Sequence, residues 1–290
     1  MDLYRRVIKT AIDVYVIGLV VVPLVIPVMG LIWLIAQSFS SKVVVGLIPN
    51  GFTLNNFYFL WKRIQFGTYT YPSIWPVVRN SLILCAVLVP TEVFASASAG
   101  YALSRLKAPG REGIMRFIVF LHAFPGILFL IALLYLLVQL GFYGKGYLTL
   151  IGVGLIKAGL DIPMSTWILK GFFDSLPWDV EWAALVDGCT RFQLWRKVLL
   201  PLIKPGISAV AILSFMSGWG EWLLAYTFLK DPSVYTLPVL ITSMVYEFRF
   251  VNWGLLAAVS LFYIAPILIT YALMQKVLLK IQLVGIKGYA

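Results

Sequence analysis

Residues 181–206 read EWAALVDGCTRFQLWRKVLLPLIKPG, a polar and charged stretch lying between apolar runs that are each long enough to cross a bilayer. Just before it, Pro177 and Asp179 are typical of a helix start, because the positive end of the helix dipole favours acidic side chains. Gly188 is placed to end that helix. We therefore expect a short helix from Pro177 to about Gly188, outside the membrane spans.

A second short helix is expected directly after the first. Thr190 and Gln193 have the spacing of a capping box, and Pro201 is expected to stop the helix. Both helices carry apolar side chains at helical spacing, so the pair could bury one face and present another. Two interpretations remain open for this hairpin, residues 177–205: an amphipathic element lying among lipid headgroups, or a docking element for a soluble partner.

The remainder of the chain is strongly apolar. Of its 290 residues, 61% are hydrophobic and only 12% are charged, and the mean hydropathy is +0.93. These values predict an all-α, polytopic membrane protein with a single transmembrane domain, residues 1–290. Six spans are expected, at about 14–36, 77–103, 117–140, 147–168, 207–229 and 253–275, with the hairpin between the fourth and the fifth.

The basic residues indicate the orientation. The formal net charge is +11, but the basic side chains flank apolar runs rather than forming one face, which argues against nucleic-acid binding. Both tails carry lysine or arginine, for example Arg5 and Lys276. Since cytoplasmic segments are enriched in these residues, we expect a multi-pass protein of the inner or plasma membrane with both termini in the cytoplasm.

A few ionisable side chains fall inside the expected spans. Glu92 lies in the second span, and Lys157 and Asp161 lie four residues apart in the fourth, where they could form an ion pair on one helix face. Trp219 and Glu221 lie in the fifth. Aromatic faces and carboxylates suit sugar recognition, so Glu92, Trp219 and Glu221 are candidates for lining a pathway, while packing or interhelical hydrogen bonds would also explain them.

The hairpin resembles the cytoplasmic signature of ABC importer membrane subunits. In that family two alanines, a glycine four residues after the second, and an Ile-x-Leu-Pro ending recur at fixed spacing. The matching residues here are Ala183, Ala184, Gly188, Val198, Leu200 and Pro201. The resemblance implies that the hairpin is a coupling helix that seats in a groove of a nucleotide-binding subunit, with Glu181 and Asp187 also at the coupling site.

One position departs from that family pattern. The pattern has a glutamate directly before the alanine pair, whereas this chain has Trp182 there and Glu181 one residue earlier. A shift of one residue turns a helical side chain by about 100°. Whether Glu181 replaces the displaced glutamate is left open by the sequence.

Two further stretches resemble the maltose-type sugar permeases. Residues 52–57 (FTLNNF), within an aromatic-rich external segment at 38–75, look like an external loop of those proteins, and residues 219–222 (WGEW) resemble their Trp-Asn-Glu-Phe stretch. The resemblance implies import of a di- or oligosaccharide of the maltose or trehalose type. It also implies several partners: a homologous second permease, an ATPase dimer that binds ATP and Mg, an extracytoplasmic sugar-binding protein, and membrane lipid.

Three classes of function are weighed. The ATP-driven importer subunit is the leading one, and an ion-coupled secondary transporter using Glu92, Lys157, Asp161 and Glu221 is the alternative. A membrane enzyme is disfavoured, because the sequence contains no H-E-x-x-H helix and no G-x-S-x-G elbow. It also contains no G-x-x-x-x-G-K-[ST] loop, so no cofactor is expected on this chain and ATP hydrolysis is expected in a partner.

Overall fold

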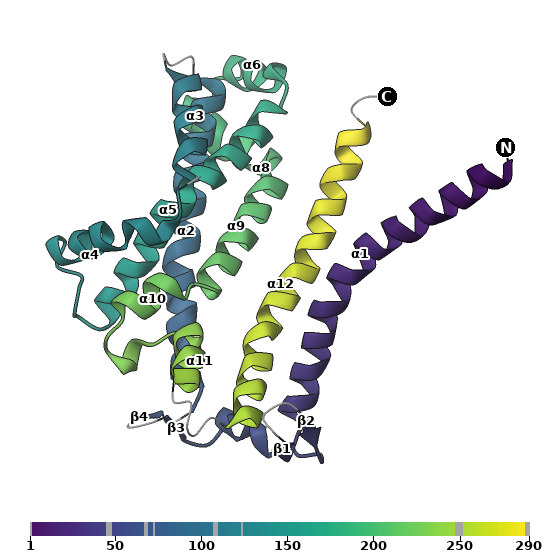
Figure 1. Cartoon of the computed structure of the whole chain (residues 1–290). Coiled ribbons are helices and arrows are strands. Elements are labelled where there is room, and N and C mark those ends of the chain that lie inside the picture. The colour runs from purple at the N-terminus through teal and green to yellow at the C-terminus, as the bar shows by residue number, and fades with distance from the viewer. Residues whose placement is uncertain are drawn as a thin grey trace. The chain divides into compact units, whose positions relative to one another are not determined.

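The structure, a computed structural model, describes residues 2–44, 48–66, 69–71, 73–106, 110–122, 124–246 and 252–287 (Figure 1). The chain divides into two compact units. The first comprises Met1–Ser73 and Met244–Ile264, and the second comprises Ile74–Ser243 and Ala265–Ala290. The all-α class expected from the sequence is confirmed, and two short hairpins are added to it.

The first unit begins with the long helix α1 (Asp2–Ser38) and includes the first part of α12 (Trp253–Lys287). Between them β1 (Lys42–Val44) pairs antiparallel with β2 (Ile48–Asn50), and β3 (Ile64–Phe66) pairs with β4 (Tyr69–Tyr71). These hairpins were not expected within the segment 38–75, of which residues 45–47, 67–68 and 72 lie outside the described part.

A 3₁₀ turn, η1 (Asn55–Leu60), holds the described residues of that segment together. The Asn56 side chain donates to the backbone oxygens of Ser38 (3.0 Å) and Ser40 (2.8 Å). Phe59 is fully buried and meets the ring of Phe262 edge-on. The FTLNNF stretch therefore has a structural role in this unit: its Asn56 binds the end of α1, and Phe59, two residues after the stretch, packs on α12.

The second unit is built on three long helices packed against one another: α2 (Trp75–Arg105), α5 (Tyr147–Asp174) and α9 (Lys204–Trp219) (Figure 1). Small residues allow this close packing. A Cβ atom at Gly100 would lie 3.0 Å from the backbone nitrogen of Lys170, and one at Gly154 would lie 3.2 Å from the carbonyl oxygen of Leu84. The helices thus approach backbone to backbone at these two glycines.

The stretch 117–140 is not one straight helix. It contains α3 (Arg111–His122), the 3₁₀ turn η2 (Gly126–Phe129) and α4 (Leu130–Gln139), and the chain bends by 95° between α3 and the following helical segment. Pro125 lies at the bend as the N-cap of η2. A proline has no backbone N–H to continue the preceding helix, which accounts for the break.

The remaining described elements are α10 (Leu223–Phe228), η4 (Pro232–Val234) and α11 (Leu237–Tyr246), besides the hairpin helices. Within the part of the chain that the structure describes, five helical stretches are long and apolar enough to cross a membrane, and the bent pair makes six if it is counted as one span. The five are Tyr15–Ser38, Trp75–Arg105, Tyr147–Asp174, Lys204–Phe228 and Trp253–Ala272. The division into six spans stays a prediction.

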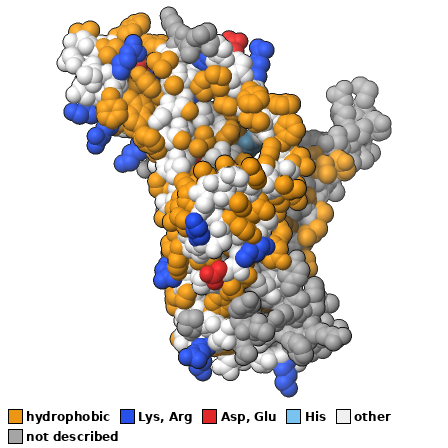
Figure 2. All heavy atoms as spheres, turned by 90° about the vertical axis from the view of Figure 1, so that its left-hand side faces the viewer, with side chains coloured by type: hydrophobic (Ala, Val, Ile, Leu, Met, Phe, Trp, Pro, Cys, Tyr) orange, Lys and Arg blue, Asp and Glu red, His pale blue; other side chains and the backbone are white. Residues whose placement is uncertain are grey.

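Apolar side chains cover much of the surface of the described residues (Figure 2). Ile131 in α4 is 86% exposed, and Leu82 and Phe94 in α2 are also exposed. Exposed aliphatic and aromatic groups on bilayer-length helices are in their preferred solvent when lipid surrounds them.

Candidate functional site

The first hairpin helix is α6 (Trp178–Val186), with Pro177 as its N-cap. Gly188 follows the helix with a φ of +84°, and the N–H of Cys189 donates to the carbonyl oxygen of Ala184 (3.1 Å). This is a left-handed helix end, a conformation that glycine adopts without strain. The expectation that Gly188 ends this helix is confirmed.

The second hairpin helix runs through three consecutive segments. It consists of α7 (Arg191–Gln193), the π-helical turn η3 (Leu194–Leu199) and α8 (Leu200–Leu202). The expected capping box is present: the N–H of Thr190 donates to Oε1 of Gln193 (2.9 Å), and the N–H of Gln193 donates to Oγ1 of Thr190 (3.3 Å).

Pro201 does not stop this helix, contrary to the expectation from sequence. It lies inside α8, and α9 starts at Lys204 only two residues after α8 ends. The wider π turn ends directly before α8, so Pro201 occupies the first turn of a new segment, where a missing N–H leaves no bond unmade. The hairpin therefore continues almost directly into α9.

The inner face of the hairpin is a hydrophobic cluster. Ala184, Leu194 and Leu199 are buried against Leu169 and Phe173 near the end of α5. Trp195 packs on the same side, edge-on to Phe94 of α2 with ring centroids 6.3 Å apart. Burial of this face fixes the hairpin against the ends of α2 and α5.

The outer face of the hairpin is also partly apolar, although no described residue covers it. Val186 is 86% exposed, Phe192 is 64% exposed and Trp182 is 59% exposed. The predicted coupling residues Ala183, Asp187 and Gly188 are exposed as well. An exposed apolar surface on a polar hairpin is typical of an element that meets a protein or a lipid surface.

Glu181, like Ala184, turns inward and so differs from the predicted coupling residues Ala183, Asp187 and Gly188. It is 4% exposed, and its Oε1 lies 2.5 Å from Nε of Arg105 at the end of α2. Burial raises the pKa of the Glu181 carboxyl, while the positive charges of Arg105 and Arg191 lower it. The structure thus brings Ala183, Asp187 and Gly188 to the outer surface and places Glu181 behind them.

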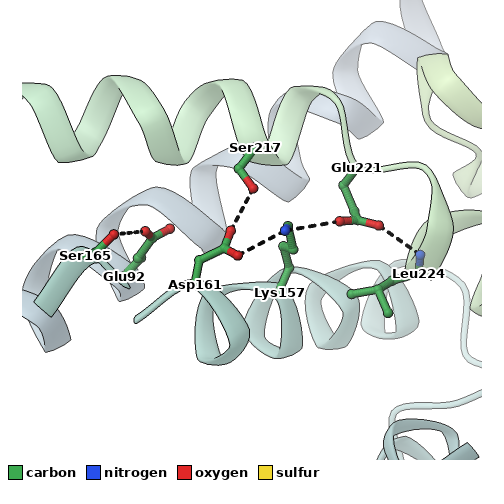
Figure 3. Close-up of polar contacts among 7 residues, drawn as sticks. All are labelled: Glu92, Lys157, Asp161, Ser165, Ser217, Glu221 and Leu224. Carbon is green, nitrogen blue, oxygen red and sulfur yellow. Dashed lines mark hydrogen bonds and ion pairs between the residues drawn. The ribbon is translucent and has the colours of Figure 1, made fainter. Parts of the chain in front are cut away.

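A polar network joins the interior of α5 to the end of α9 (Figure 3). Nζ of Lys157 lies 3.0 Å from Oδ1 of Asp161 and 3.6 Å from Oε2 of Glu221. Ser217 donates to Oδ2 of Asp161 (2.7 Å), and the N–H of Leu224 donates to Oε1 of Glu221 (2.8 Å). The expected Lys157–Asp161 pair is confirmed, whereas the contact with Glu221 was not foreseen.

The three candidate pathway residues are all buried within the chain. Glu92 is 2% exposed and accepts a hydrogen bond from the hydroxyl of Ser165 on α5. Trp219 is 2% exposed and stacks on Phe215, with ring centroids 5.8 Å apart, and Glu221 is 8% exposed. These contacts give each residue a packing role, and a pathway role for them stays a prediction.

The described residues hold no group of three or more His, Cys, Asp or Glu side chains that could hold a metal ion. Cys85 and Cys189 are both free, the first buried in α2 and the second half-buried in the hairpin. The candidate functional features of the described residues are the polar network around Lys157 and the exposed face of the hairpin.

Comparison with known proteins identifies the family. Residues 92–281 match the protein family described as "Binding-protein-dependent transport system inner membrane component". The chain is 31% identical over 233 residues to the inner membrane ABC transporter permease protein YcjP of Escherichia coli (strain K12), covering 79% of this chain and 78% of that protein. It is 33% identical over 276 residues to the maltose/maltodextrin transport system permease protein MalG of Vibrio parahaemolyticus, covering 89% and 90%.

The fold agrees with these relatives. A chain in the crystal structure of a bacterial ABC transporter involved in the import of the acidic polysaccharide alginate superposes with a TM-score of 0.70 at 20% identity, covering 93% of this chain and 96% of that chain. A bundle of bilayer-length helices with a helical hairpin between two of them defines a polytopic membrane protein. The chain belongs to the binding-protein-dependent inner membrane components of ABC transporters, so it is a non-catalytic permease whose ATPase is a separate protein.

Proposed function

We propose that this chain is the permease subunit of an ATP-driven, binding-protein-dependent importer for a di- or oligosaccharide of the maltose or trehalose type. Support for a carbohydrate comes from the relatives, because one is a maltose/maltodextrin permease and the structural neighbour imports alginate. Residues 1–290 form a single transmembrane domain with six spans, and this domain supplies half of the translocation pathway. Both termini lie in the cytoplasm.

The observation that carries this proposal is the outer face of the hairpin. Val186, Phe192 and Trp182 expose apolar surface beside Ala183 and Asp187, on an element that lies outside the candidate spans. Burying such a surface in a protein groove is favourable because it removes apolar area from water. The occupant is the nucleotide-binding ATPase, which carries the ATP and Mg, and closure of the ATPase dimer moves the hairpin.

The remaining partners follow from the class of importer. A homologous second permease completes the pathway, and an extracytoplasmic sugar-binding protein delivers the substrate to the outer side. Glu92, Trp219 and Glu221 are the candidate pathway residues, through carboxylate contacts to hydroxyls and aromatic contacts to sugar C–H faces. Membrane lipid covers the exposed apolar surface of the spans.

A matched pair of substitutions at Val186 tests the docking surface. Val186→Asp places a charge in the proposed interface and should reduce copurification of the ATPase and sugar-stimulated ATP hydrolysis, whereas Val186→Leu keeps the surface apolar and should preserve both. The position is 86% exposed, so neither change disturbs the interior of the chain. Full ATPase binding by Val186→Asp would contradict the proposal.

A second measurement separates the importer from the ion-coupled carrier that uses Glu92, Lys157, Asp161 and Glu221. Proteoliposomes that contain the purified complex should take up sugar only when ATP is supplied to the ATPase side. Gly188→Pro should uncouple ATP hydrolysis from uptake while the subunit still inserts. Uptake driven by a proton or sodium gradient without nucleotide would favour the carrier instead.

A further inference from the structure

Arg105 is the last residue of α2, and its side chain contacts the hairpin at three points. Its Nε lies 2.5 Å from Oε1 of Glu181 in α6. Its Nη2 donates to the carbonyl oxygen of Leu176 (2.7 Å), and its guanidinium lies over the ring of Trp178 at 4.5 Å from the centroid. One side chain thus binds the entry and the first turns of the hairpin to α2.

A neighbouring contact strengthens the same junction. Ser104 donates to Oδ1 of Asp174, the last residue of α5, at 2.6 Å. Lys170 pairs with the other oxygen of this carboxylate, which satisfies both sides of Asp174. The end of α2 is therefore joined to the end of α5 as well as to α6, so all three elements meet at this point.

The burial of the Arg105–Glu181 pair distinguishes it from an ordinary surface ion pair. The exposed fractions of the two side chains are 4% and 6%, against 84% and 83% for the Arg116–Glu112 pair on α3. An exposed pair is screened by water and contributes little, but loss of one partner from a buried pair leaves an uncompensated charge. The rigid guanidinium also joins two contacts, because Nη2 donates to Leu176 while Nε lies against the Glu181 carboxylate, whereas a lysine ammonium is a single point charge.

The link joins segments that are distant in sequence. Arg105 precedes the hairpin by the whole of α3, α4 and α5, so a displacement of α6 reaches α2 directly through this contact as well as through the covalent chain and α5. α2 in turn packs along α5 and α9, and Glu92 of α2 accepts a hydrogen bond from Ser165 of α5. A rigid connection at Arg105 would therefore make the hairpin and the three-helix core move together.

We propose that Arg105 is a positioning residue that holds Glu181 and the start of α6 to α2, so that movement of the hairpin is passed to α2. The inference rests on the proposed function, in which an ATPase moves the hairpin. It also accounts for the position of the acid one residue before Trp182: in this chain that glutamate serves as the internal partner of Arg105, while Trp182 occupies the outer face.

The first test measures coupling in the purified complex with its ATPase and binding protein. Arg105→Gln and Glu181→Gln should each lower the amount of sugar transported per ATP hydrolysed by about two- to thirtyfold, the range typical of residues along a coupling network, with the ATPase still bound. Arg105→Lys should retain part of the coupling. Arg116→Gln, which breaks only the exposed pair, is the matched control and should leave the ratio unchanged.

The second test measures the connection itself, because a purely structural role would lower transport and ATP hydrolysis together. Spin labels at Leu106→Cys and Asp179→Cys, both exposed positions outside the proposed docking surface, are introduced with Cys189→Ser. The distance between labels should stay the same with and without ATP when Arg105 is present, and should change with ATP in Arg105→Lys. A distance that is independent of ATP in both backgrounds would overturn the proposal, even if Arg105→Gln fails to assemble.

The two proposals fail in different ways. If Val186→Asp prevents ATPase binding while the Arg105 variants transport normally per ATP, the Arg105 link is wrong and the docking hairpin stands. If Val186→Asp leaves ATPase binding and coupling intact, the proposed function of the hairpin is wrong.

Discussion

The hairpin and the network around Lys157 both pair buried charges, but they differ in the side chains that they expose. In the network, Lys157 is met by Asp161 from the same helix and by Glu221 from the short segment between α9 and α10. In the hairpin, the Glu181 charge is likewise turned inward, but apolar Val186 and Phe192 face outward.

The comparison shows that exposed apolar side chains occur in two different settings in this chain, on a bilayer-length helix and on the hairpin. On α2, which is long and apolar enough to cross a membrane, exposed apolar side chains are in a favourable solvent when lipid surrounds them. On the hairpin, which is polar in sequence and too short to span, the same kinds of side chain are exposed outside the candidate spans, where our proposal assigns them to the ATPase interface. Substitutions in each region separate the contacts that stabilise the helix core from the contacts that fix the conformation of the hairpin.

The largest effect is expected for Lys157→Met. This change leaves the Asp161 and Glu221 carboxylates largely buried without their cation, and the loss of one partner from a buried pair costs about 3–5 kcal/mol. The free energy of unfolding in detergent should fall by that amount. Combining Lys157→Met with Asp161→Asn and Glu221→Gln should restore much of it, and equal stability of the single variant and the wild type would contradict the role of the network.

A smaller loss is expected at the turn of the hairpin. Gly188→Ala forces a side chain into the left-handed conformation at φ +84°, which costs about 1–2 kcal/mol, although space is available around the new Cβ. Gly188→Asn should cost less, because asparagine tolerates this conformation better. Chemical denaturation monitored at the hairpin would measure both, and the prediction is wrong if alanine is tolerated as well as glycine.

Loss of the capping box should have a similar or slightly smaller effect. Thr190→Ala removes the oxygen that accepts from the N–H of Gln193, and such a change at an N-cap costs about 1 kcal/mol. Thr190→Ser keeps the acceptor and serves as the control. Hydrogen exchange at Gln193 should accelerate in the alanine variant alone; unchanged protection there would show that the cap is not needed.

The smallest effect is expected for Ser165→Ala in the core. The hydroxyl of Ser165 donates to Glu92 across the α2–α5 interface, and interhelical hydrogen bonds in membranes contribute about 0.6 kcal/mol on average. Ser98→Ala, which removes a hydroxyl bonded within its own helix, should cost still less. Thermal unfolding of the two variants side by side tests the difference, and a loss at Ser165 as large as that at Lys157 would place Glu92 in the same network.

Local spacing was enough to predict several features. Gly188 at a helix end, the Thr190–Gln193 box and the Lys157–Asp161 pair all involve residues within a few positions of each other, and they are present in the structure. The Pro201 prediction was wrong, because a proline stops a helix only where its N–H would have been needed, and the π turn before it changed that requirement.

Contacts between distant segments were not predicted. Nothing in the spacing of Arg105 and Glu181, or of Lys157 and Glu221, indicates that they meet, because each pair depends on how whole helices pack. The resemblance of the hairpin to a known signature predicted which residues are special but not which way they face. Glu181 and Ala184 face inward, although they were grouped with Ala183, Asp187 and Gly188, which lie on the outer surface.

The sequence by itself determined the class of this protein. Long apolar helices are stable in a lipid bilayer and not in water, and the residue spacing in the hairpin indicated the family. The tertiary structure alone decided which charges are paired and which apolar groups remain uncovered. The physical reason is the range of the interactions: helix periodicity and capping act within a few residues, whereas burial and ion pairing depend on segments brought together only by packing.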